Sequence, residues 1–517
     1  MTVAALETSA HASDRTFLRR FDPVLALILL GLSVGVLLVH DIEYMLSHPF
    51  WTDEAWVAVF TNFPFREWVG RSSSTPLGWI FLLDLAPSGH LRLVPLAFSV
   101  GVVTVAAVLA YQMEWSSRWK AWVAALFVGG AAGLSPASLI RNDLKHYTAD
   151  ACLSLVVLVF AGLLDRRWTT RRLAIFVVVA VASASVSYVS MFVSGAVFLV
   201  LLATALLRRH DRIVPVIVAG AGTGTVFVLI GMLVVLPSLD RALFDYWEQS
   251  YLEVDDGVGT LANIVWERMG QVVGLLGLST FAVVALTGLG LKAMRILARP
   301  LIGGSVVVLF LMMFALGMLG LYPFLDVRTS HFLLVMLTVI VSIAIVYGLL
   351  GERRQTVGSF VTLVAVAVAV VATGWPHVRA ESIPNEDVRS QVRYVEEAMR
   401  PGDVVLVNMP GSNGVTYYWS QDAPLAFVDN DALATGWMTI INRDDMVFAT
   451  GRDYPAVREA LDQARDLAVE TGGQMWIIRT HVNGPEDEAW MRALSDLELE
   501  PVSIPVGSED LLLLGSH

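Results

Sequence analysis

Two adjacent carboxylates between two indoles, in the stretch Trp51-Thr52-Asp53-Glu54-Ala55-Trp56, are the first residues of the chain that could do chemistry. A carboxylate held beside a substrate hydroxyl can accept its proton, and flanking indoles offer flat faces to a ligand. The same residues would also suit a solvated cap on a surface helix, with Thr52 or Asp53 as its N-cap. The spacing alone does not decide between these two interpretations.

Basic residues concentrate in a second stretch, Arg141-Asn142-Asp143-Leu144-Lys145-His146-Tyr147, with Asp150 one helical turn later. Arg141 and Lys145 are the residue types that hold a phosphate, and a helix N-terminus here would add partial positive charge. The alternative is a plain helix start in which Asp143 pairs with Lys145 or Arg141.

A third stretch, Tyr322-Pro323-Phe324-Leu325-Asp326-Val327-Arg328, precedes His331. Pro323 should end a helix, because its ring removes a backbone donor and clashes with the preceding turn. Arg328 could then reach the same cleft as the second stretch. The alternative is a loop closed by an Asp326–Arg328 ion pair.

Residues 240–256 form a fourth candidate, in which carboxylates alternate with aromatic residues that include Tyr246 and Trp247. Such a mixture suits stacking on a sugar ring and binding of its hydroxyl groups. It equally suits an interfacial amphipathic loop. The stretch Asp255-Asp256-Gly257 could be a turn or part of a cation site, but the sequence holds no HExxH, CxxC or EF-hand motif, so a metal site is neither predicted nor excluded.

The composition shows which elements must position these residues. The chain has 517 residues, of which 56% are hydrophobic and 16% charged, and several windows of about 20 apolar residues match the thickness of a bilayer. This predicts a mainly α-helical protein that crosses the membrane many times. The single cysteine, Cys152, excludes an intrachain disulfide and should pack in a span. The net charge of −12 is unevenly distributed, so its location matters more than its sum. We expect membrane lipids as partners and no nucleic acid.

Hydropathy predicts about eleven transmembrane helices, and basic residues fall in every second loop between them. By the positive-inside rule those loops and the N-terminus are cytoplasmic, and the C-terminus lies outside. Residues 76–87 are apolar but too short to cross, and are expected to form an interfacial helix. The expected spans are 23–40, 91–112, 121–139, 147–164, 173–190, 191–207, 213–236, 271–291, 301–321, 331–350 and 358–375.

Three regions follow from this pattern. Residues 1–22 should be a cytoplasmic segment, and 23–375 a transmembrane domain whose first external loop, 41–90, carries the acidic pair. Residues 376–517 alternate helical with strand-like stretches, which predicts an extracytoplasmic α/β domain with a mainly parallel sheet. Its expected helices are 386–400, 454–471 and 485–498, and its expected strands 403–408, 424–429, 474–480 and 510–515.

All four candidate stretches then lie on the extracytoplasmic side. A carboxylate that can deprotonate a hydroxyl, next to cations that can hold a phosphate, fits transfer of a group from a lipid phosphate to an alcohol. Neutralising the leaving phosphate would supply much of the rate.

The order of these motifs over residues 23–375 resembles the GT-C superfamily of polyprenyl-phosphate-sugar-dependent glycosyltransferases, particularly the protein mannosyltransferase and aminoarabinose transferase branch. Asp53-Glu54 stands where these enzymes carry an acidic pair in the first external loop. Thr75 replaces the first proline of their His/Lys-Pro-Pro-Leu segment. The remaining similar segments are Gly89 to Leu93, Leu134-Ser135-Pro136 followed by Lys145-His146-Tyr147 and Asp150, and Tyr322-Pro323 followed by Arg328.

The resemblance implies an inverting transfer with Asp53 as general base and Glu54 placing the acceptor or a cation. Arg141, Lys145, Tyr147, Tyr322 and Arg328 would bind the donor phosphate. Trp51, Trp56, His146, Tyr246 and Trp247 would bind acceptor or sugar. Some members use a divalent cation (Mg²⁺, Mn²⁺ or Ca²⁺), whereas others need none.

The resemblance also implies a polyprenyl-phosphate-linked sugar as donor and a glycan, lipid or protein as acceptor, at the plasma membrane. Mannose and arabinofuranose are the sugars to expect if the source is actinobacterial. The C-terminal domain would bind an acceptor glycan or serve as a structural lid.

Two other functions fit parts of the pattern. An O-antigen-ligase-like glycan transferase is also polytopic, but its large external loop lies between late spans. A non-enzymatic transporter of lipid-linked sugars would place ionisable residues at mid-membrane, whereas here they gather at one rim.

Overall fold

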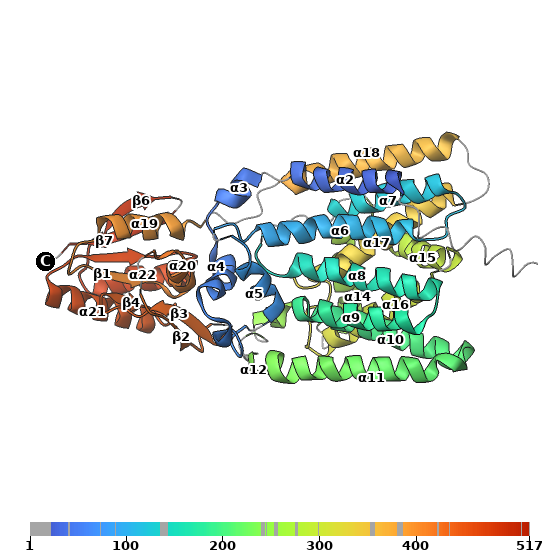
Figure 1. Cartoon of the computed structure of the whole chain (residues 1–517). Helices are drawn as coiled ribbons and strands as arrows, with labels where there is room; N and C mark the ends of the chain where they lie inside the picture. The colour runs from blue at the N-terminus through green and yellow to red at the C-terminus, as the bar shows by residue number, and fades with distance from the viewer. Residues whose placement is uncertain are drawn as a thin grey trace, which may run out of the picture.

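A computed structural model gives the structure of the protein as a bundle of helices with a smaller α/β unit at one end (Figure 1). The first loop, from α3 to α5, lies between the bundle and the α/β unit. The structure describes residues 22–39, 42–72, 74–87, 89–134, 143–238, 243, 246–252, 257–274, 278–297, 299–351, 357–379, 386–420, 423–433, 435–507 and 509–515.

The bundle helices are apolar on nearly all faces, as expected for helices that meet either lipid or one another. Within the described part of the chain, six helical segments are long and apolar enough to cross a membrane, and Pro23–Val39 and Val357–Ala372 are shorter apolar helices. The protein is therefore a multi-pass membrane protein. The bundle helices are α2 Pro23–Val39, α6 Leu93–Tyr111, α7 Arg118–Gly133, α8 Tyr147–Arg166, α9 Thr170–Val186, α10 Val189–Arg208, α11 Ile213–Ile230, α12 Leu236–Ser238, α14 Val258–Gly274, α15 Thr280–Ile296, α16 Pro300–Met318, α17 His331–Leu350 and α18 Val357–Arg379.

Most expected spans coincide with one of these helices, but the span expected at 271–291 is wrong. In its place α14 ends at Gly274 and α15 begins at Thr280. The charged pair Glu267 and Arg268 lies within α14 and lowers its hydropathy, so the sequence pattern concealed this helix. The count of eleven spans and their orientation stay predictions.

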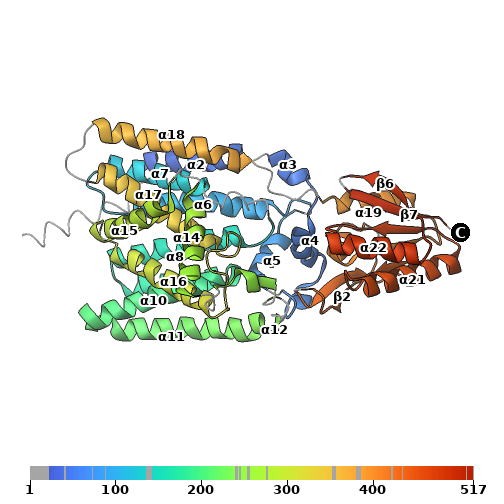
Figure 2. The ribbon, with the colours of Figure 1, turned by 180° about the vertical axis from the view of Figure 1, so that it is seen from behind.

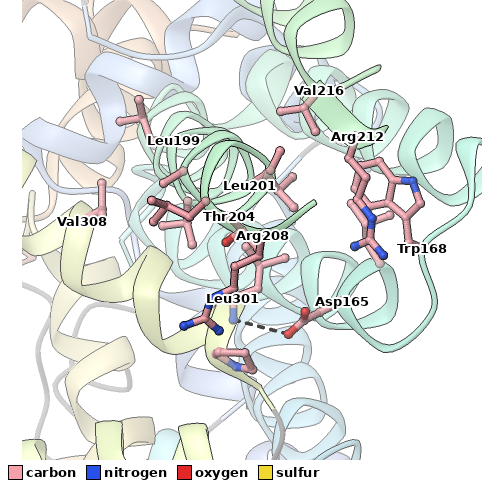
Figure 3. A pocket seen from close by; sticks show the side chains of 16 residues that line it. Asp165, Trp168, Leu199, Leu201, Thr204, Arg208, Arg212, Val216, Leu301 and Val308 are labelled. Atoms are coloured by element: carbon pink, nitrogen blue, oxygen red, sulfur yellow. Dashed lines mark hydrogen bonds between the residues drawn. The ribbon is translucent and has the colours of Figure 1, made fainter. Parts of the chain in front are cut away.

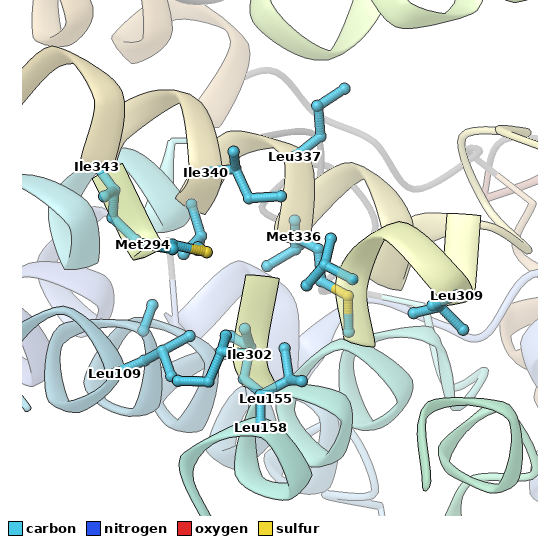
Figure 4. Packing of buried hydrophobic residues seen from close by; sticks show 14 of the residues in the cluster. Leu109, Leu155, Leu158, Met294, Ile302, Leu309, Met336, Leu337, Ile340 and Ile343 are labelled. Carbon is cyan, nitrogen blue, oxygen red and sulfur yellow. The ribbon is translucent and has the colours of Figure 1, made fainter. Parts of the chain in front are cut away.

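Helix α17 lies in the middle of the bundle, where nearly every one of its side chains is buried. Leu337, Ile340 and Ile343 of α17 pack against side chains of α6, α8, α15 and α16 (Figure 4). Small residues let the helices approach closely: a Cβ on Gly290 of α15 would lie 2.4 Å from the Ile340 carbonyl oxygen. This rigid centre fixes the loops at both ends of the bundle.

The first loop folds into short helices that cover one end of the bundle. The helix expected at 76–87 is present as α5, Leu77–Asp84, and its interfacial position stays a prediction. The N-cap of α4 is Trp51, whose side chain makes no capping bond, so the expectation of Thr52 or Asp53 as the cap is wrong. The other short helices are α3 Ile42–Ser47, α4 Thr52–Ala58, η1 Val59–Asn62 and η2 Phe65–Glu67.

The C-terminal unit contains a five-stranded sheet in the order β4-β1-β5-β7-β6. Strand β1 pairs in parallel with β4 and β5, whereas β7 pairs antiparallel with both β5 and β6. The expectation of a mainly parallel sheet is therefore wrong: the sheet is mixed, because β6 and β7 are joined by a short turn that reverses the chain. The five strands are β1 Val404–Val407, β4 Met446–Phe448, β5 Met475–Ile478, β6 Val502–Val506 and β7 Glu509–Leu514.

A second, two-stranded sheet of β2 and β3 and four helices complete this unit. The three expected helices and the four expected strands are present within a few residues of their predicted bounds, whereas α20, β3, β4 and β6 were not predicted. The remaining elements are α19 Val388–Ala398, α20 Ser412–Tyr418, α21 Tyr454–Thr471, α22 Gly484–Asp496, β2 Leu425–Asp429 and β3 Trp437–Ile441.

The C-terminal unit packs on the first loop mainly through aromatic side chains. Phe427 of β2 lies 4.2 Å from Phe63 between ring centroids, and Trp437 of β3 lies 5.3 Å from Phe60. The Trp437 indole also donates a hydrogen bond to the Arg71 carbonyl at 2.8 Å. Seen from behind, α4 and α5 again lie between the bundle and the sheet (Figure 2). The first loop and the C-terminal unit therefore share one side of the bundle.

Candidate active site

Residues far apart in the chain meet at Arg328, at the bundle end covered by the first loop. Its Nη2 atom donates to Asp53 Oδ2 at 2.7 Å and to Asp143 Oδ2 at 2.9 Å. The ring of Trp51 lies 5.5 Å and that of Tyr147 5.7 Å from the guanidinium carbon. The predicted convergence of the early acidic loop with the two later basic loops is thus present among the described residues.

Local hydrogen bonds hold each loop in place. Asp143 accepts the backbone N–H of Lys145 at 2.9 Å, and the buried indole of Trp79 donates to the Leu144 carbonyl at 2.7 Å. The first bond closes a turn directly before α8, and the second ties that turn to α5. Residues 143–145, directly before α8, are therefore held by two hydrogen bonds.

The loop that carries Arg328 is built around Asp326. The Asp326 carboxylate accepts the backbone N–H groups of Arg328 and Thr329, each at 2.9 Å. The Tyr322 hydroxyl donates to the Thr329 carbonyl at 2.6 Å. The side-chain ion pair considered between Asp326 and Arg328 is absent, because Asp326 binds the backbone and leaves the guanidinium to Asp53 and Asp143.

Lys145 is a buried cation beside this cluster. Its Nζ atom lies 3.3 Å from the centre of the Trp56 ring, which is a cation–π contact. Burial lowers the pKa of Lys145 to about 8, although Asp53 and Asp143 favour its charged form. Asp143 pairs with Arg328 and binds only the backbone of Lys145, so the expected Asp143–Lys145 ion pair is not formed.

The two carboxylates differ in their surroundings. Burial raises the pKa of Asp53, but the charges of Lys145 and Arg328 outweigh it and hold the pKa below its usual value. Burial raises the pKa of Asp143 above its usual value, and the charge of Asp53 adds to the rise, although Arg328 and Lys145 oppose it. Asp53 is also the more exposed, with a third of its side chain accessible against 9% for Asp143. Asp53 is therefore the ionised carboxylate that a substrate can reach.

Glu54 has a different partner from Asp53. It is fully buried, and both of its oxygens accept hydrogen bonds from Arg92. Burial raises the pKa of Glu54 to about 7 despite that partner. Arg92 also donates to the carbonyls of Met45 and His48, each at 2.7 Å. The expected role of Glu54 in holding acceptor or cation does not fit a carboxylate that is enclosed in this way.

A cavity of about 250 Å³ adjoins the cluster and collects most of the remaining predicted residues. Tyr147, Tyr322, His146 and Trp247 line it. Tyr246 does not line it and is more than half exposed. Because its lining also includes the apolar side chains of Val189 and Phe192 of α10 and of Val235 just before α12, the cavity suits a ligand with a polar head and an apolar tail. The full lining is Ser74, His146, Tyr147, Asp150, Tyr188, Val189, Phe192, Val235, Leu243, Trp247, Tyr251, Leu321, Tyr322, Pro323 and Thr329.

Some of the predicted residues lie outside the part of the chain that the structure describes, and some residues at the site were not predicted from the sequence. Arg141 and the stretch Asp255-Asp256 lie outside the described residues. Sequence reasoning missed Asp143 as a partner of Arg328, although it stands two residues before Lys145. It also missed Glu386, which accepts hydrogen bonds from Thr52 across 334 residues of sequence. No local pattern could have shown that contact.

A larger cavity, of about 440 Å³, opens at the opposite end of the bundle (Figure 3). It lies between the C-terminal ends of α8 and α10 and the N-terminal end of α16. Apolar side chains line most of it, with Arg208, Arg212 and Asp165 among the other lining residues; one Asp165 oxygen accepts the Leu301 backbone N–H at 3.3 Å. Asp165 forms no ion pair with Arg208 or Arg212, whereas Arg328 pairs with both Asp53 and Asp143, so the chemistry is assigned to the Arg328 end.

Neither a family model nor a curated protein sequence matches the chain. Its structure is similar to that of ArnT from Cupriavidus metallidurans bound to undecaprenyl phosphate, with a TM-score of 0.56 at 13% identity over 94% of this chain and 97% of that one. An oligosaccharyltransferase from Archaeoglobus fulgidus in the apo form gives a TM-score of 0.53 at 11% identity over 89% of this chain and 70% of that one. The chain has the GT-C fold. In this GT-C fold the Asp53–Arg328–Asp143 cluster lies in the first-loop end of the bundle, directly below the C-terminal unit.

Proposed function

We propose that the protein is an integral-membrane glycosyltransferase that moves a sugar from a polyprenyl-phosphate donor to an acceptor hydroxyl on the extracytoplasmic face. The observation that carries this proposal is the meeting of Asp53, Arg328 and Lys145 beside a cavity with an apolar wall. An acid with a lowered pKa stands next to two cations, and a lipid-linked phosphate needs both a cationic seat and an apolar channel.

The proposed reaction is a single displacement. The acceptor hydroxyl gives its proton to the Asp53 carboxylate while its oxygen bonds to the anomeric carbon of the sugar. The bond between that carbon and the phosphate oxygen breaks, and the phosphate leaves with the electron pair. Attack opposite the leaving group inverts the anomeric centre. Arg328 and Lys145 stabilise the negative charge that develops on the departing phosphate.

Arg328 would also set when Asp53 becomes a base. Without donor, its guanidinium binds both Asp53 and Asp143. A donor phosphate would compete with Asp53 for that guanidinium, whereas the more deeply buried Asp143 would keep its bond. Losing a cationic partner raises the pKa of Asp53 and makes it a better proton acceptor. Donor binding would thus prepare the base.

The described residues do not supply a metal site around this cluster. They contain no group of three His, Cys, Asp or Glu side chains placed to hold an ion. The two carboxylates that could begin such a site already share the Arg328 guanidinium. The proposed steps use only side chains of the chain itself. The pair of Glu54 and Arg92 would hold the first loop in place and would not bind a cation.

The finer assignments extend from this site. Tyr147, Tyr322, His146 and Trp247 would line the path of the lipid-linked sugar, and Trp51 and Trp56 would flank the acceptor. We expect mannose or arabinofuranose as the sugar, a glycan, lipid or protein as acceptor, and the plasma membrane as the location. ArnT in the similar structure is bound to undecaprenyl phosphate, which makes that lipid phosphate the first donor carrier to test.

The test compares Asp53→Asn with Asp84→Asn in protein reconstituted into nanodiscs. Asp84 is an exposed acid of the same loop, so its substitution repeats the chemical change away from the cluster. Product from synthetic undecaprenyl-phosphate sugars is measured by mass spectrometry, and binding of undecaprenyl phosphate is measured separately. We expect Asp53→Asn to lower turnover by at least about a hundredfold while lipid binding persists, and Asp84→Asn to act as the wild type.

Full turnover in Asp53→Asn would contradict the role of Asp53. Movement of the lipid-linked sugar across the membrane by the wild type, without any glycosidic product, would favour the transporter and overturn the transferase.

A further inference from the structure

Three side chains from two parts of the chain meet directly beside the proposed base. Glu386, which precedes α19, accepts hydrogen bonds through Oε2 from the backbone N–H and the hydroxyl of Thr52, each at 2.9 Å. Its other oxygen, Oε1, lies 2.6 Å from Nδ1 of His481. Thr52 is the residue before Asp53 on the first turn of α4. The C-terminal unit thus holds the backbone of the acidic loop through one carboxylate.

The pair joins a largely buried carboxylate to an imidazole that is 43% exposed. The Glu386 side chain is only 11% exposed. His481 lies in the turn between β5 and α22 with φ at 52°, a left-handed conformation that non-glycine residues seldom adopt. The turn is fixed on its other side, because the Asn408 side chain bonds both the N–H and the carbonyl of Thr480. The imidazole is therefore held against Glu386 by the sheet of the C-terminal unit.

The charges around His481 come from three elements. Glu386 raises the pKa of His481 above its usual value through the hydrogen bond, and burial opposes this. Arg452, which follows β4, also opposes it, whereas Asp53 on α4 favours the imidazolium. In return, the hydrogen bonds of His481 and Thr52 outweigh burial and lower the pKa of Glu386. Both shifts favour the form of the pair in which a carboxylate binds an imidazolium.

We infer that Glu386 and His481 form a positioning pair for Asp53, so that the C-terminal unit is part of the active site and not only a glycan-binding or covering domain. The carboxylate fixes the first turn of α4 through Thr52, and the imidazolium keeps that carboxylate ordered and adds positive charge facing Asp53. Loss of the imidazolium proton loosens this hold. Turnover therefore depends on the protonation of a residue in a separate domain.

This inference rests on the proposed function, since it concerns the placing of the proposed base. Its first test uses three variants of the full chain. His481→Asn keeps a donor near the position of Nδ1, suits the left-handed backbone and cannot titrate. His481→Ala removes the donor. His210→Asn is the control, because His210 is an exposed histidine at the other end of the bundle.

We expect His481→Ala to lower kcat by about tenfold to a hundredfold, the cost of a small misplacement of a reacting group, with little change in KM. We expect His481→Asn to recover most of that loss. In the wild type, kcat should fall as the pH rises through a value above about 6.5. That fall should be absent in His481→Asn and present in His210→Asn. The loss of charge on Lys145 near pH 8 should remain in all variants.

A second measurement needs no turnover. The ¹³Cε1 signal of His481, assigned by its disappearance in His481→Asn, is titrated by NMR in the wild type, Glu386→Gln and Asp53→Asn. We expect its pKa to fall in both variants, and further in Glu386→Gln, because Glu386 binds the ring directly.

The two measurements separate failure of this inference from failure of the proposed function. If the wild type forms no glycosidic product, the proposed function fails, and the titration still shows whether His481 is coupled to Glu386 and Asp53. An ordinary pKa of His481 that does not change in either variant would overturn the pairing. A kcat–pH profile of His481→Asn identical to that of the wild type would overturn its part in turnover.

Discussion

Replacing Arg328 with glutamine is the perturbation that bears most directly on the cluster. The substitution removes one guanidinium that two carboxylates share, at 2.7 Å from Asp53 and 2.9 Å from Asp143. Lys145 remains as the only other cation among the described groups that act on both acids. One of the two carboxylates should then keep a proton at neutral pH, because two close acids with too little positive charge cannot both ionise.

The size of the effect follows from the two hydrogen bonds. A bond to a charged group contributes about 1.5–3 kcal/mol when it is buried, but Arg328 and Asp53 are each about one-third exposed, and solvent weakens the pair. We therefore expect a total loss of about 3 kcal/mol. In a chain of this size that corresponds to a fall in Tm of about 3 °C.

The sign of the pH dependence makes the prediction specific. In the wild type the pKa of Asp53 is lowered, so its contribution to stability is present above the unfolded pKa and is lost as the pH falls through the folded value. In Arg328→Gln the pKa values of Asp53 and Asp143 both rise, so protonation relieves their repulsion at a higher pH. The difference in Tm between wild type and variant should therefore be largest near pH 7 and should narrow towards pH 5.

Thermal unfolding in detergent, followed between pH 5 and pH 7, measures this difference directly. Arg66→Gln is the control, because the Arg66 side chain is 85% exposed and should change Tm little at any pH. A difference in Tm that is absent, or that stays constant across this range, would refute the shared guanidinium.

Two further predictions concern the neighbouring cations. Burial lowers the pKa of Lys145 to about 8, so the side chain is charged below that pH. In a vesicle assay, the affinity of the wild type for undecaprenyl phosphate should fall above pH 8, whereas that of Lys145→Arg should persist. A fall of equal size in both proteins would rule out Lys145 as the cause. Arg92→Met should lower the free energy of unfolding by about 3–5 kcal/mol, because it leaves Glu54 buried without its partner. A loss below about 1 kcal/mol would mean that Glu54 and Arg92 are not paired as described.

Hydropathy predicted most of the bundle because lipid imposes one simple requirement, a long run of apolar residues. Where a helix carries charges, as α14 does with Glu267 and Arg268, that signal failed. In the C-terminal unit, period and turn residues located most helices and strands. They could not show that β7 runs antiparallel to β5, because the direction of pairing depends on contacts between distant strands.

The same division applies to the site. Asp53, Lys145 and Arg328 were predicted from residue type and from their common side of the membrane, and the structure brings them together. Which acid pairs with which cation was not predictable: a pair of Asp143 with its sequence neighbours was considered only as the alternative, and Asp143 binds Arg328 across 185 residues. The partners supplied by the C-terminal unit, Glu386 above all, lie even farther away in sequence. Only the fold brings these groups within hydrogen-bonding distance.

The central claim is that the Arg328 cluster is where a lipid-linked phosphate binds. A cryo-EM structure of the protein with undecaprenyl phosphate tests it most directly. The account predicts phosphate density in contact with Arg328 and Lys145, with the lipid chain in the cavity lined by Tyr147 and Tyr322. Phosphate density at the opposite end of the bundle, beside Arg208, with the Arg328–Asp53 bond unchanged, would contradict it.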